Sequence, residues 1–372
     1  MFQIFASPSR YVQGANATAS LGLEMKGLGL EGPVLILAGR SARRQLGTAW
    51  ASTFSQIGVR HDIIPFGGEC CRREIATGVK AGAESGARTI VGAGGGKALD
   101  TARAIAADLG IQAVNCPTLA STDAPTSALS VIYSEAGVVE EIRFYPRNPA
   151  LVLVDTSVIL NAPRRLLIAG MGDALSTFFE ARACARSGAP NCRGGTTTQA
   201  ALAVAELCWR NLRADGTAAL TAMDEQRITP AFERIVETNT LLSGLGFESA
   251  GLAAAHAIHN GLTVAPGTHS FFHGEKVAFG TLAQLALEQS PEPEFREVLT
   301  FCSSIGLPVT LAEIGLGEMD DSLLRQIAER SVITGESIHH EPFPVSAEAV
   351  IQAIRDADAA GRAWRSGSAG QR

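Results

Sequence analysis

The sequence lacks the features that mark membrane, secreted and nucleic-acid-binding proteins. No uninterrupted apolar run reaches about 18 residues, and residues 1–13 contain no basic segment followed by a long apolar stretch. Lysine and arginine form no dense cluster, and the formal net charge is −6. Because phosphate binding needs a concentrated basic face, a nucleic-acid partner is not expected. We expect a cytoplasmic protein without a cleaved leader that binds neither membranes nor nucleic acids.

Paired cysteines and a hydrolase nucleophile are also missing. The seven cysteines are odd in number and include no Cys-x-x-Cys pair, so reduced thiols are expected instead of disulfides or a thiolate zinc site. No Gly-x-Ser-x-Gly sequence occurs, which argues against a Ser/His/Asp nucleophile. The chain is nevertheless long, with 372 residues, 39 of them glycine, and 46% hydrophobic residues. At roughly 150 residues per domain, it favours two domains with sizeable cores.

The two halves of the chain carry different patterns. In the first half, helical patterns alternate with expected strands at Val34–Ala38, Arg60–Phe66, Thr89–Gly92, Ala113–Cys116, Ser127–Tyr133, Ile142–Tyr145 and Leu151–Asp155. Such alternation forms a mostly parallel sheet covered on both faces. After Ala162 and Pro163 only helical patterns recur, among them Pro230–Gly246. We therefore predict an α/β domain over residues 1–162 and an all-helical domain over residues 163–372.

A glycine-rich turn follows one predicted strand and opens a predicted helix. Its sequence is Val91-Gly92-Ala93-Gly94-Gly95-Gly96-Lys97. Glycines let the backbone approach a diphosphate closely, and the free amides at a helix start donate to its oxygens. A Walker loop is excluded, because Val91 stands where that motif needs glycine and Ala98 where it needs Ser or Thr. The remaining interpretations are a dinucleotide-binding loop and a plain tight turn.

Two further groups of polar residues have the composition of ligand sites. The segment Pro117–Ser127 is dense in hydroxyl groups and contains Asp123, which can hold an alcohol hydroxyl; an ordinary turn has the same composition. In the second half, Asp173 lies in a predicted helix, while histidines gather in residues 256–259 and 269–273. Two histidines and one carboxylate leave coordination positions open on a catalytic divalent ion. Histidines that serve only the core or a helix cap remain the alternative.

At these residues the chain resembles the glycerol dehydrogenases of the iron-containing alcohol dehydrogenase superfamily. The most specific segment is Leu166–Leu175, LLIAGMGDAL. The other matching segments are Gly94–Asp100, Thr118–Tyr133, Asn148–Asp155, Ala162–Cys184, His256–Gly261 and His273–Leu282. The resemblance implies a dehydroquinate synthase-like architecture, with a nucleotide-binding domain, a helical domain and catalysis in the cleft between them.

The resemblance also implies roles for individual residues. One zinc ion per chain would be held by Asp173, His256 and His273, Asp123 would bind a substrate hydroxyl, and His269 could pass a proton to water. Gly94, Gly95, Gly96 and Lys97 would meet the diphosphate of NAD. The rest of the cofactor site would be lined by Asp100, Thr118, Ser121, Ser127, Leu129 and Tyr133.

The implied activity is the reversible oxidation of glycerol, or a related vicinal diol, to dihydroxyacetone. The implied assembly is a large homo-oligomer, commonly an octamer. Other activities remain open at this point: a dehydroquinate synthase-like lyase, a phosphoglycerol dehydrogenase, and an NADPH-dependent reductase of 2-oxo acids or hydroxyketones. A binding protein without activity is disfavoured by the presence of Asp173, His256, His273 and Asp123.

One position departs from the family pattern. The family usually has an aspartate just after the second strand region, where it grips the adenosine ribose, but this chain has Gly39 and Arg40, followed by Arg43 and Arg44. An acidic residue disfavours a 2′-phosphate, whereas arginine accommodates one. The sequence therefore suggests tolerance of NADP or a preference for it. A solvated helix start is the alternative explanation for the arginines.

Overall fold

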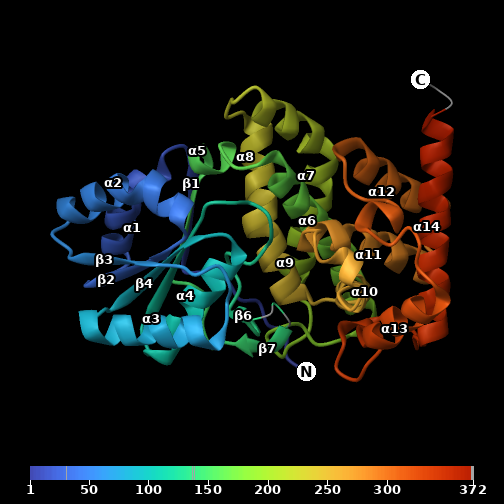
Figure 1. Cartoon of the computed structure of the whole chain (residues 1–372), viewed down its shortest axis with the longest axis horizontal. Helices are drawn as coiled ribbons and strands as arrows, with labels where there is room; N and C mark the ends of the chain where they lie inside the picture. The colour runs from blue at the N-terminus through green and yellow to red at the C-terminus, as the bar shows by residue number, and fades with distance from the viewer. Residues whose placement is uncertain (31, 136, 138, 370–372) are drawn as a thin grey trace. The chain divides into compact units, whose positions relative to one another are not determined.

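The computed structural model describes residues 1–30, 32–135, 137 and 139–369, and it contains two compact units (Figure 1). Unit 1 comprises Met1–Ala6, Arg164–Thr221 and Leu245–Arg372, and unit 2 comprises Ser7–Pro163 and Ala222–Gly244. In this division Met1–Ala6 groups with the helical unit and Ala222–Gly244 groups with the sheet. The two continuous domains expected over residues 1–162 and 163–372 stay a prediction. Hydrogen bonds described below hold Ala222–Gly244 in unit 2.

Unit 2 is built on a six-stranded parallel sheet in the order β1-β8-β5-β4-β2-β3. The strands are β1 (Arg10–Gly14), β2 (Val34–Ala38), β3 (His61–Pro65), β4 (Thr89–Gly94), β5 (Gln112–Pro117) and β8 (Leu151–Asp155). The strands β2, β4 and β8 are buried throughout, as expected for apolar runs covered on both faces. The predicted parallel α/β domain is confirmed. Strand β1 was not expected, because its half-buried sequence RYVQG lies at the sheet edge and carries no apolar run.

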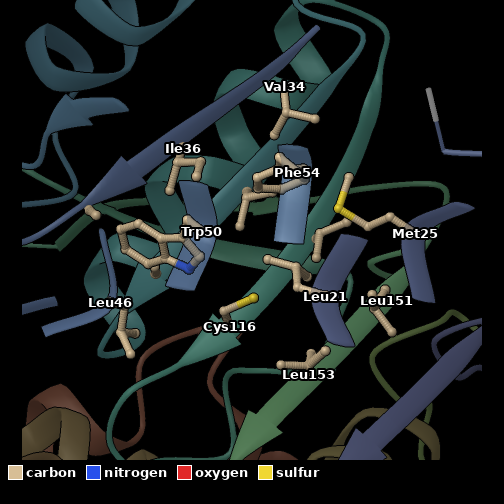
Figure 2. Close-up of a cluster of buried hydrophobic side chains, with 14 of the residues drawn as sticks. Leu21, Met25, Val34, Ile36, Leu46, Trp50, Phe54, Cys116, Leu151 and Leu153 are labelled. Atoms are coloured by element: carbon tan, nitrogen blue, oxygen red, sulfur yellow. The ribbon is translucent and has the colours of Figure 1, made fainter. Parts of the chain in front are cut away.

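Helices cover both faces of this sheet (Figure 1). They are α1 (Leu21–Gly27) and α2 (Arg40–Gln56) on one face, and α3 (Arg72–Ser85) and α4 (Gly96–Asp108) on the other. Unit 2 also contains α5 (Thr156–Leu160), α8 (Pro230–Glu237) and a 3-10 turn η1 (Ala17–Ser20). Because side chains alternate along a strand, β2 sends Val34 and Ile36 to the core formed with Trp50 and Phe54 (Figure 2). Leu35 belongs to a second core with residues of α3 and α4.

A separate antiparallel hairpin consists of β6 (Leu129–Tyr133) and β7 (Val139–Phe144). These strands overlap the two expected from the sequence at Ser127–Tyr133 and Ile142–Tyr145. Strand β6 packs against α4, and Tyr133 donates its backbone N–H to the Cys70 carbonyl at 2.8 Å. The hairpin therefore extends unit 2 beside the helix that follows the glycine-rich turn.

Unit 1 is helical, as predicted. Its main helices are α6 (Arg164–Ser187), α7 (Gln199–Asp224), α9 (Ser243–Ala250), α10 (Ala254–Leu262), α11 (His273–Leu287), α12 (Glu292–Ile305), α13 (Asp321–Ser331) and α14 (Ala347–Ala369). Short 3-10 turns are η3 (Pro266–Thr268), η4 (Ala312–Ile314) and η5 (Ser337–His340). Helix α11 is almost fully buried and packs against α6, α10 and α14. Among the described residues of this unit, β-structure is limited to the bridge between Gln3 and Thr196.

The helix predicted over Pro230–Gly246 is not continuous. Helix α8 passes into a π-helix, η2 (Thr238–Leu242), and then into α9. Apolar periodicity does not distinguish an α-helix from a π-turn, so this change could not be predicted from the residue pattern. In the described part of the chain, no single helix is long and apolar enough to cross a membrane; the bent pair Pro230–Ala250 and Ala254–Leu262 meets the criteria only jointly.

Candidate active site

Close helix packing in unit 1 brings three predicted ligands together. Asp173 lies within α6, His256 in the first turn of α10, and His273 is the first residue of α11. A glycine adjoins two of them, so the helices can approach closely. A Cβ atom at Gly274 would lie only 1.8 Å from the carbonyl oxygen of Ala169 on α6. Any larger residue at that position would push α11 away from α6.

The three side chains present their donor atoms to one point. The Asp173 Oδ1 atom lies 3.2 Å from His273 Nε2 and 3.6 Å from His256 Nε2. The ligand atoms of all three residues lie within 4.8 Å of one another. A divalent ion bound tetrahedrally at about 2.0–2.2 Å separates its ligand atoms by about 3.3–3.6 Å. The donor set therefore fits such an ion in both chemistry and spacing.

A buried carboxylate sets the orientation of His256. Glu180 lies two helical turns after Asp173 on α6, and its Oε2 atom is 2.6 Å from His256 Nδ1. Its Oε1 atom accepts the backbone N–H groups of Ala253 and His256 at 2.8 and 3.0 Å. A carboxylate on Nδ1 directs Nε2 of the same ring toward a metal. The sequence reasoning missed Glu180, although the seven-residue spacing from Asp173 on an apolar helix was a usable signal.

A second histidine performs the same task for His273. His259 Nε2 lies 3.0 Å from His273 Nδ1, and His259 Nδ1 lies 3.2 Å from Asn260 Oδ1. The Asn260 amide nitrogen donates to Glu336, so its oxygen is the atom that faces His259. In this arrangement His259 donates through Nδ1 and accepts the Nδ1–H of His273. His273 Nε2 is then left facing Asp173, where a cation is needed between two electron-rich atoms.

The charges of the site favour a cation. Burial acts to raise the pKa of Asp173, but the facing His273 and His256 outweigh it and hold that pKa well below its ordinary value. Burial also opposes the ionisation of Glu180, yet His256 holds its pKa low. Burial, together with the neighbouring His273, lowers the pKa of His259 well below its ordinary value. Two ionised carboxylates and a neutral His259 thus surround the point that the three ligands share.

His269 does not join this group. Its side chain is exposed, and its Nε2 atom lies 3.0 Å from the carbonyl oxygen of Thr263. The metal-ligand group formed by the described residues contains only Asp173, His256 and His273. The proton-carrying role expected for His269 therefore stays a prediction.

The glycine-rich turn of unit 2 has the geometry of an anion site. Strand β4 ends at Gly94, Gly95 caps α4 without a side-chain hydrogen bond, and the first turn of α4 contains no acidic residue. A Cβ atom at Gly94 would lie 2.7 Å from Ala98 Cβ, so only glycine fits there. Helix N-termini of this kind bind phosphate oxygens through backbone N–H groups. Lys97 begins beside them, with its Nζ atom 2.6 Å from Glu69, a residue that the sequence reasoning did not single out.

The other predicted cofactor residues, apart from Asp100, lie on β6 and on the segment after β5, and two of them contact the turn. Thr118 donates its N–H to the Gly94 carbonyl at 2.9 Å, and Lys97 Nζ lies 4.8 Å from the centre of the Tyr133 ring. Thr118, Ser121, Leu129 and Tyr133 are half-buried, and Ser127 is buried. The contact of these residues with a cofactor stays a prediction.

Asp100 has a different setting from the one expected of a cofactor contact. Its buried carboxylate pairs with Arg103 and accepts the backbone N–H of Val131 at 2.9 Å. Its backbone carbonyl accepts the hydroxyl of Ser130 at 2.8 Å. Asp100 thus ties α4 to strand β6. Direct contact between Asp100 and a cofactor stays a prediction.

The arginines after β2 and the glycine-rich turn after β4 both follow the carboxyl ends of their strands, on the same side of the sheet. In the register of the neighbouring strands, Ala38 pairs with Ala93, so the segments that follow them are adjacent. Gly39 caps α2, and the first turn of α2 contains no acidic residue. Arg40 and Arg44 are exposed and Arg43 is half-buried. The basic character predicted for this position is therefore present at the helix start.

A parallel sheet with a glycine-rich turn and a helical unit with an Asp-His-His group define an iron-containing alcohol dehydrogenase, and residues 8–156 match that family. The chain is 46% identical to a glycerol dehydrogenase of Escherichia coli O6:H1 over 97% of its own length and 98% of the relative's. It is 48% identical to one of Thermotoga maritima, covering 95% and 96% of the two chains. The crystal structure of glycerol dehydrogenase from Schizosaccharomyces pombe matches with a TM-score of 0.95 and 37% identity, over 99% and 93%. The chain belongs to the glycerol dehydrogenase family.

Proposed function

We propose that this protein catalyses the reversible oxidation of glycerol, or of a related vicinal diol, to dihydroxyacetone, with zinc and a nicotinamide cofactor. The observation that carries the proposal is the convergence of Asp173 Oδ1, His256 Nε2 and His273 Nε2. Full-length relatives named glycerol dehydrogenase support the substrate. Two imidazoles and one carboxylate suit zinc and leave room for substrate oxygens.

Each part of the chain has a defined task in this reaction. A divalent ion at the site would lower the pKa of a substrate hydroxyl, and the nicotinamide ring would accept the hydride. Glu180 and His259 would hold the two imidazole ligands in the tautomer that a metal requires. The backbone N–H groups after Gly95 would bind the cofactor diphosphate, and Lys97 would add a positive charge. Asp123 would accept a hydrogen bond from a substrate hydroxyl.

Two nicotinamide cofactors, NAD and NADP, fit different observations. Membership of the family supports NAD, and the absence of an acidic residue in the first turn of α2 supports acceptance of a 2′-phosphate. Arg40 and Arg43 would provide its positive partners. An NADPH-dependent reductase of hydroxyketones or 2-oxo acids would use the same site in reverse. Steady-state rates with both cofactors separate these forms, because a strong preference for NAD contradicts any role of the arginines in selection.

The resemblance also supports a cytoplasmic location and a homo-oligomer, octameric as in other members of the family. Light scattering coupled to size-exclusion chromatography measures the assembly directly. A monomer under all conditions would contradict the proposal.

The activity is tested by metal removal and restoration. We expect the purified protein to oxidise glycerol, to lose this activity in a chelator and to regain it with zinc. Asp173→Asn should lose bound metal and roughly a thousand-fold or more in kcat/KM, because the metal generates the reactive alkoxide. Asp356→Asn, on the exposed face of α14, is the matched control. Full metal content and activity in Asp173→Asn would overturn the proposal.

A further inference from the structure

A segment from the helical half of the sequence packs in unit 2 against the loop Pro117–Ser127, which carries residues expected to bind the cofactor and the substrate. Ala222–Gly244 belongs to the same compact unit as the sheet, and it contains the π-helix η2 (Thr238–Leu242). The wide turn of a π-helix is rare and is found frequently at functional sites. Asn239 within this turn, and Ser243 directly after it, contact a loop of unit 2.

The segment contacts the loop Pro117–Ser127 at three points. The Asn239 amide nitrogen donates to the Ala120 carbonyl at 2.9 Å, and the Ser243 hydroxyl donates to Asp123 Oδ2 at 2.9 Å. Both side chains are buried. The third point is Gly244, where an added Cβ would lie 1.9 Å from Thr126 Oγ1 and 2.8 Å from the Asp123 carbonyl. Among the described contacts, the segment therefore reaches the loop through the Asn239 and Ser243 hydrogen bonds and a close backbone approach at Gly244.

The same segment is anchored on its other side to the edge of the sheet. The Tyr11 hydroxyl lies 2.8 Å from Thr240 Oγ1, and the Gln13 amide donates to Glu233 at 2.6 Å. Both anchors come from strand β1. Because Thr240 lies between Asn239 and Ser243, the contacts to β1 fix the turn from which the other two residues reach the loop. The loop is consequently positioned against a fixed element of unit 2.

Each hydrogen bond acts on a different group of the loop. Ala120 lies between Thr118 and Ser121, the residues expected to meet the cofactor, whereas Asp123 is the residue expected to hold a substrate hydroxyl. We propose that Asn239 and Ser243 are positioning residues, with Asn239 fixing the cofactor part of the loop and Ser243 fixing the plane of the Asp123 carboxylate. This inference rests on the proposed function, because it assigns the substrate to Asp123.

Two variants separate the two roles. Ser243→Ala should raise KM for glycerol roughly ten-fold and leave the affinity for NAD unchanged, since a hydrogen bond to a carboxylate contributes about that factor. Ser243→Thr, which keeps the hydroxyl, should restore KM. Asn239→Ala should weaken NAD binding by a similar factor, measured by titration without substrate. A purely structural role would lower Tm without this split between the two ligands.

A matched control and a direct binding assay make the test decisive. Thr53→Val removes a buried hydroxyl that bonds the Gly22 N–H elsewhere in unit 2, and it should lower Tm without changing either ligand constant. Equal glycerol KM in Ser243→Ala and the wild type overturns the role of Ser243. Unchanged NAD affinity in Asn239→Ala overturns that of Asn239. If the wild type binds NAD but oxidises no diol, the proposed function fails, and NAD titration of Asn239→Ala still decides the inference about the cofactor side.

Discussion

At the scale of single residues, the proposed metal site depends on side chains outside its set of three ligands. The two imidazole ligands are each held through Nδ1, His256 by Glu180 and His273 by His259. These contacts decide which nitrogen of each ring faces Asp173. The ligand types alone therefore do not make the site, because a rotated or differently protonated ring would present N–H where a lone pair is needed.

This dependence predicts that His259→Ala weakens metal binding without removing a ligand. We expect a loss of roughly 10–100-fold in zinc affinity, because His273 loses the group that fixes its tautomer. A competitive titration of the metal-free protein against a chelating dye measures it. His339→Gln, an exposed histidine that bonds the Val332 carbonyl, is the control. Zinc affinity equal to that of the wild type in His259→Ala would contradict the prediction.

At the scale of elements, glycine decides how close the helices come. Gly172 and Gly274 lie next to Asp173 and His273, and a Cβ at Gly172 would meet the Gly274 carbonyl at 2.3 Å. The α6–α11 contact is thus a backbone-to-backbone approach at the point where the ligands sit. Helix packing and ligand spacing are consequently one property of these two elements.

Gly274→Ala should therefore disturb both stability and metal binding. The added Cβ would lie 1.8 Å from the Ala169 carbonyl, so the helices must separate, at a cost of roughly 1–3 kcal/mol. We expect a lower Tm together with a lower zinc affinity. Gly47→Ala is the control, because nothing lies within 4 Å of a Cβ at that position in α2 and alanine favours the helix. A Gly274→Ala protein with wild-type Tm and affinity would show that the contact is not tight.

At the scale of the whole molecule, buried carboxylates connect stability to pH. Glu341 is buried in unit 1, and its Oε1 atom accepts the Ala254 N–H at 3.1 Å. Burial, and then the charges of Glu288 and Glu180, raise its pKa to about 8, while Arg182 acts in the opposite direction. Because this pKa exceeds the ordinary value of 4.5, the folded state binds the proton more tightly than the unfolded state. Stability should therefore fall as the pH rises from about 4.5 to about 8.

Glu341→Gln should remove this loss of stability at high pH. The amide keeps an oxygen for the Ala254 N–H and carries no charge, so its Tm should exceed that of the wild type above about pH 8. The difference should shrink toward about pH 5, where the wild-type carboxyl is protonated in the folded protein. Thermal unfolding between about pH 5 and pH 8 measures the Tm of the wild type and of Glu341→Gln, with the exposed Glu329→Gln as control. A Tm difference that is independent of pH would contradict the assignment.

Residue patterns alone were enough to predict the parallel strands and the glycine-rich turn, and a family resemblance named Asp173, His256 and His273 as metal ligands. Strand β2 illustrates why: five consecutive apolar residues leave only a doubly covered strand as a stable arrangement. Such patterns are local, so they survive without knowledge of the fold. The edge strand β1 carries no such pattern and was missed.

The hydrogen-bond partners of these residues, and the grouping of Ala222–Gly244 with the sheet, became known only from the folded structure. Glu180 and His256 are 76 residues apart in sequence, and Ser243 and Asp123 are 120 apart. No periodicity relates residues at such separations, because their contact follows from how helices and loops pack. The Asp-His-His group was therefore named from the sequence. The groups that orient its rings, and those that hold the loop Pro117–Ser127, could be identified only from the packing.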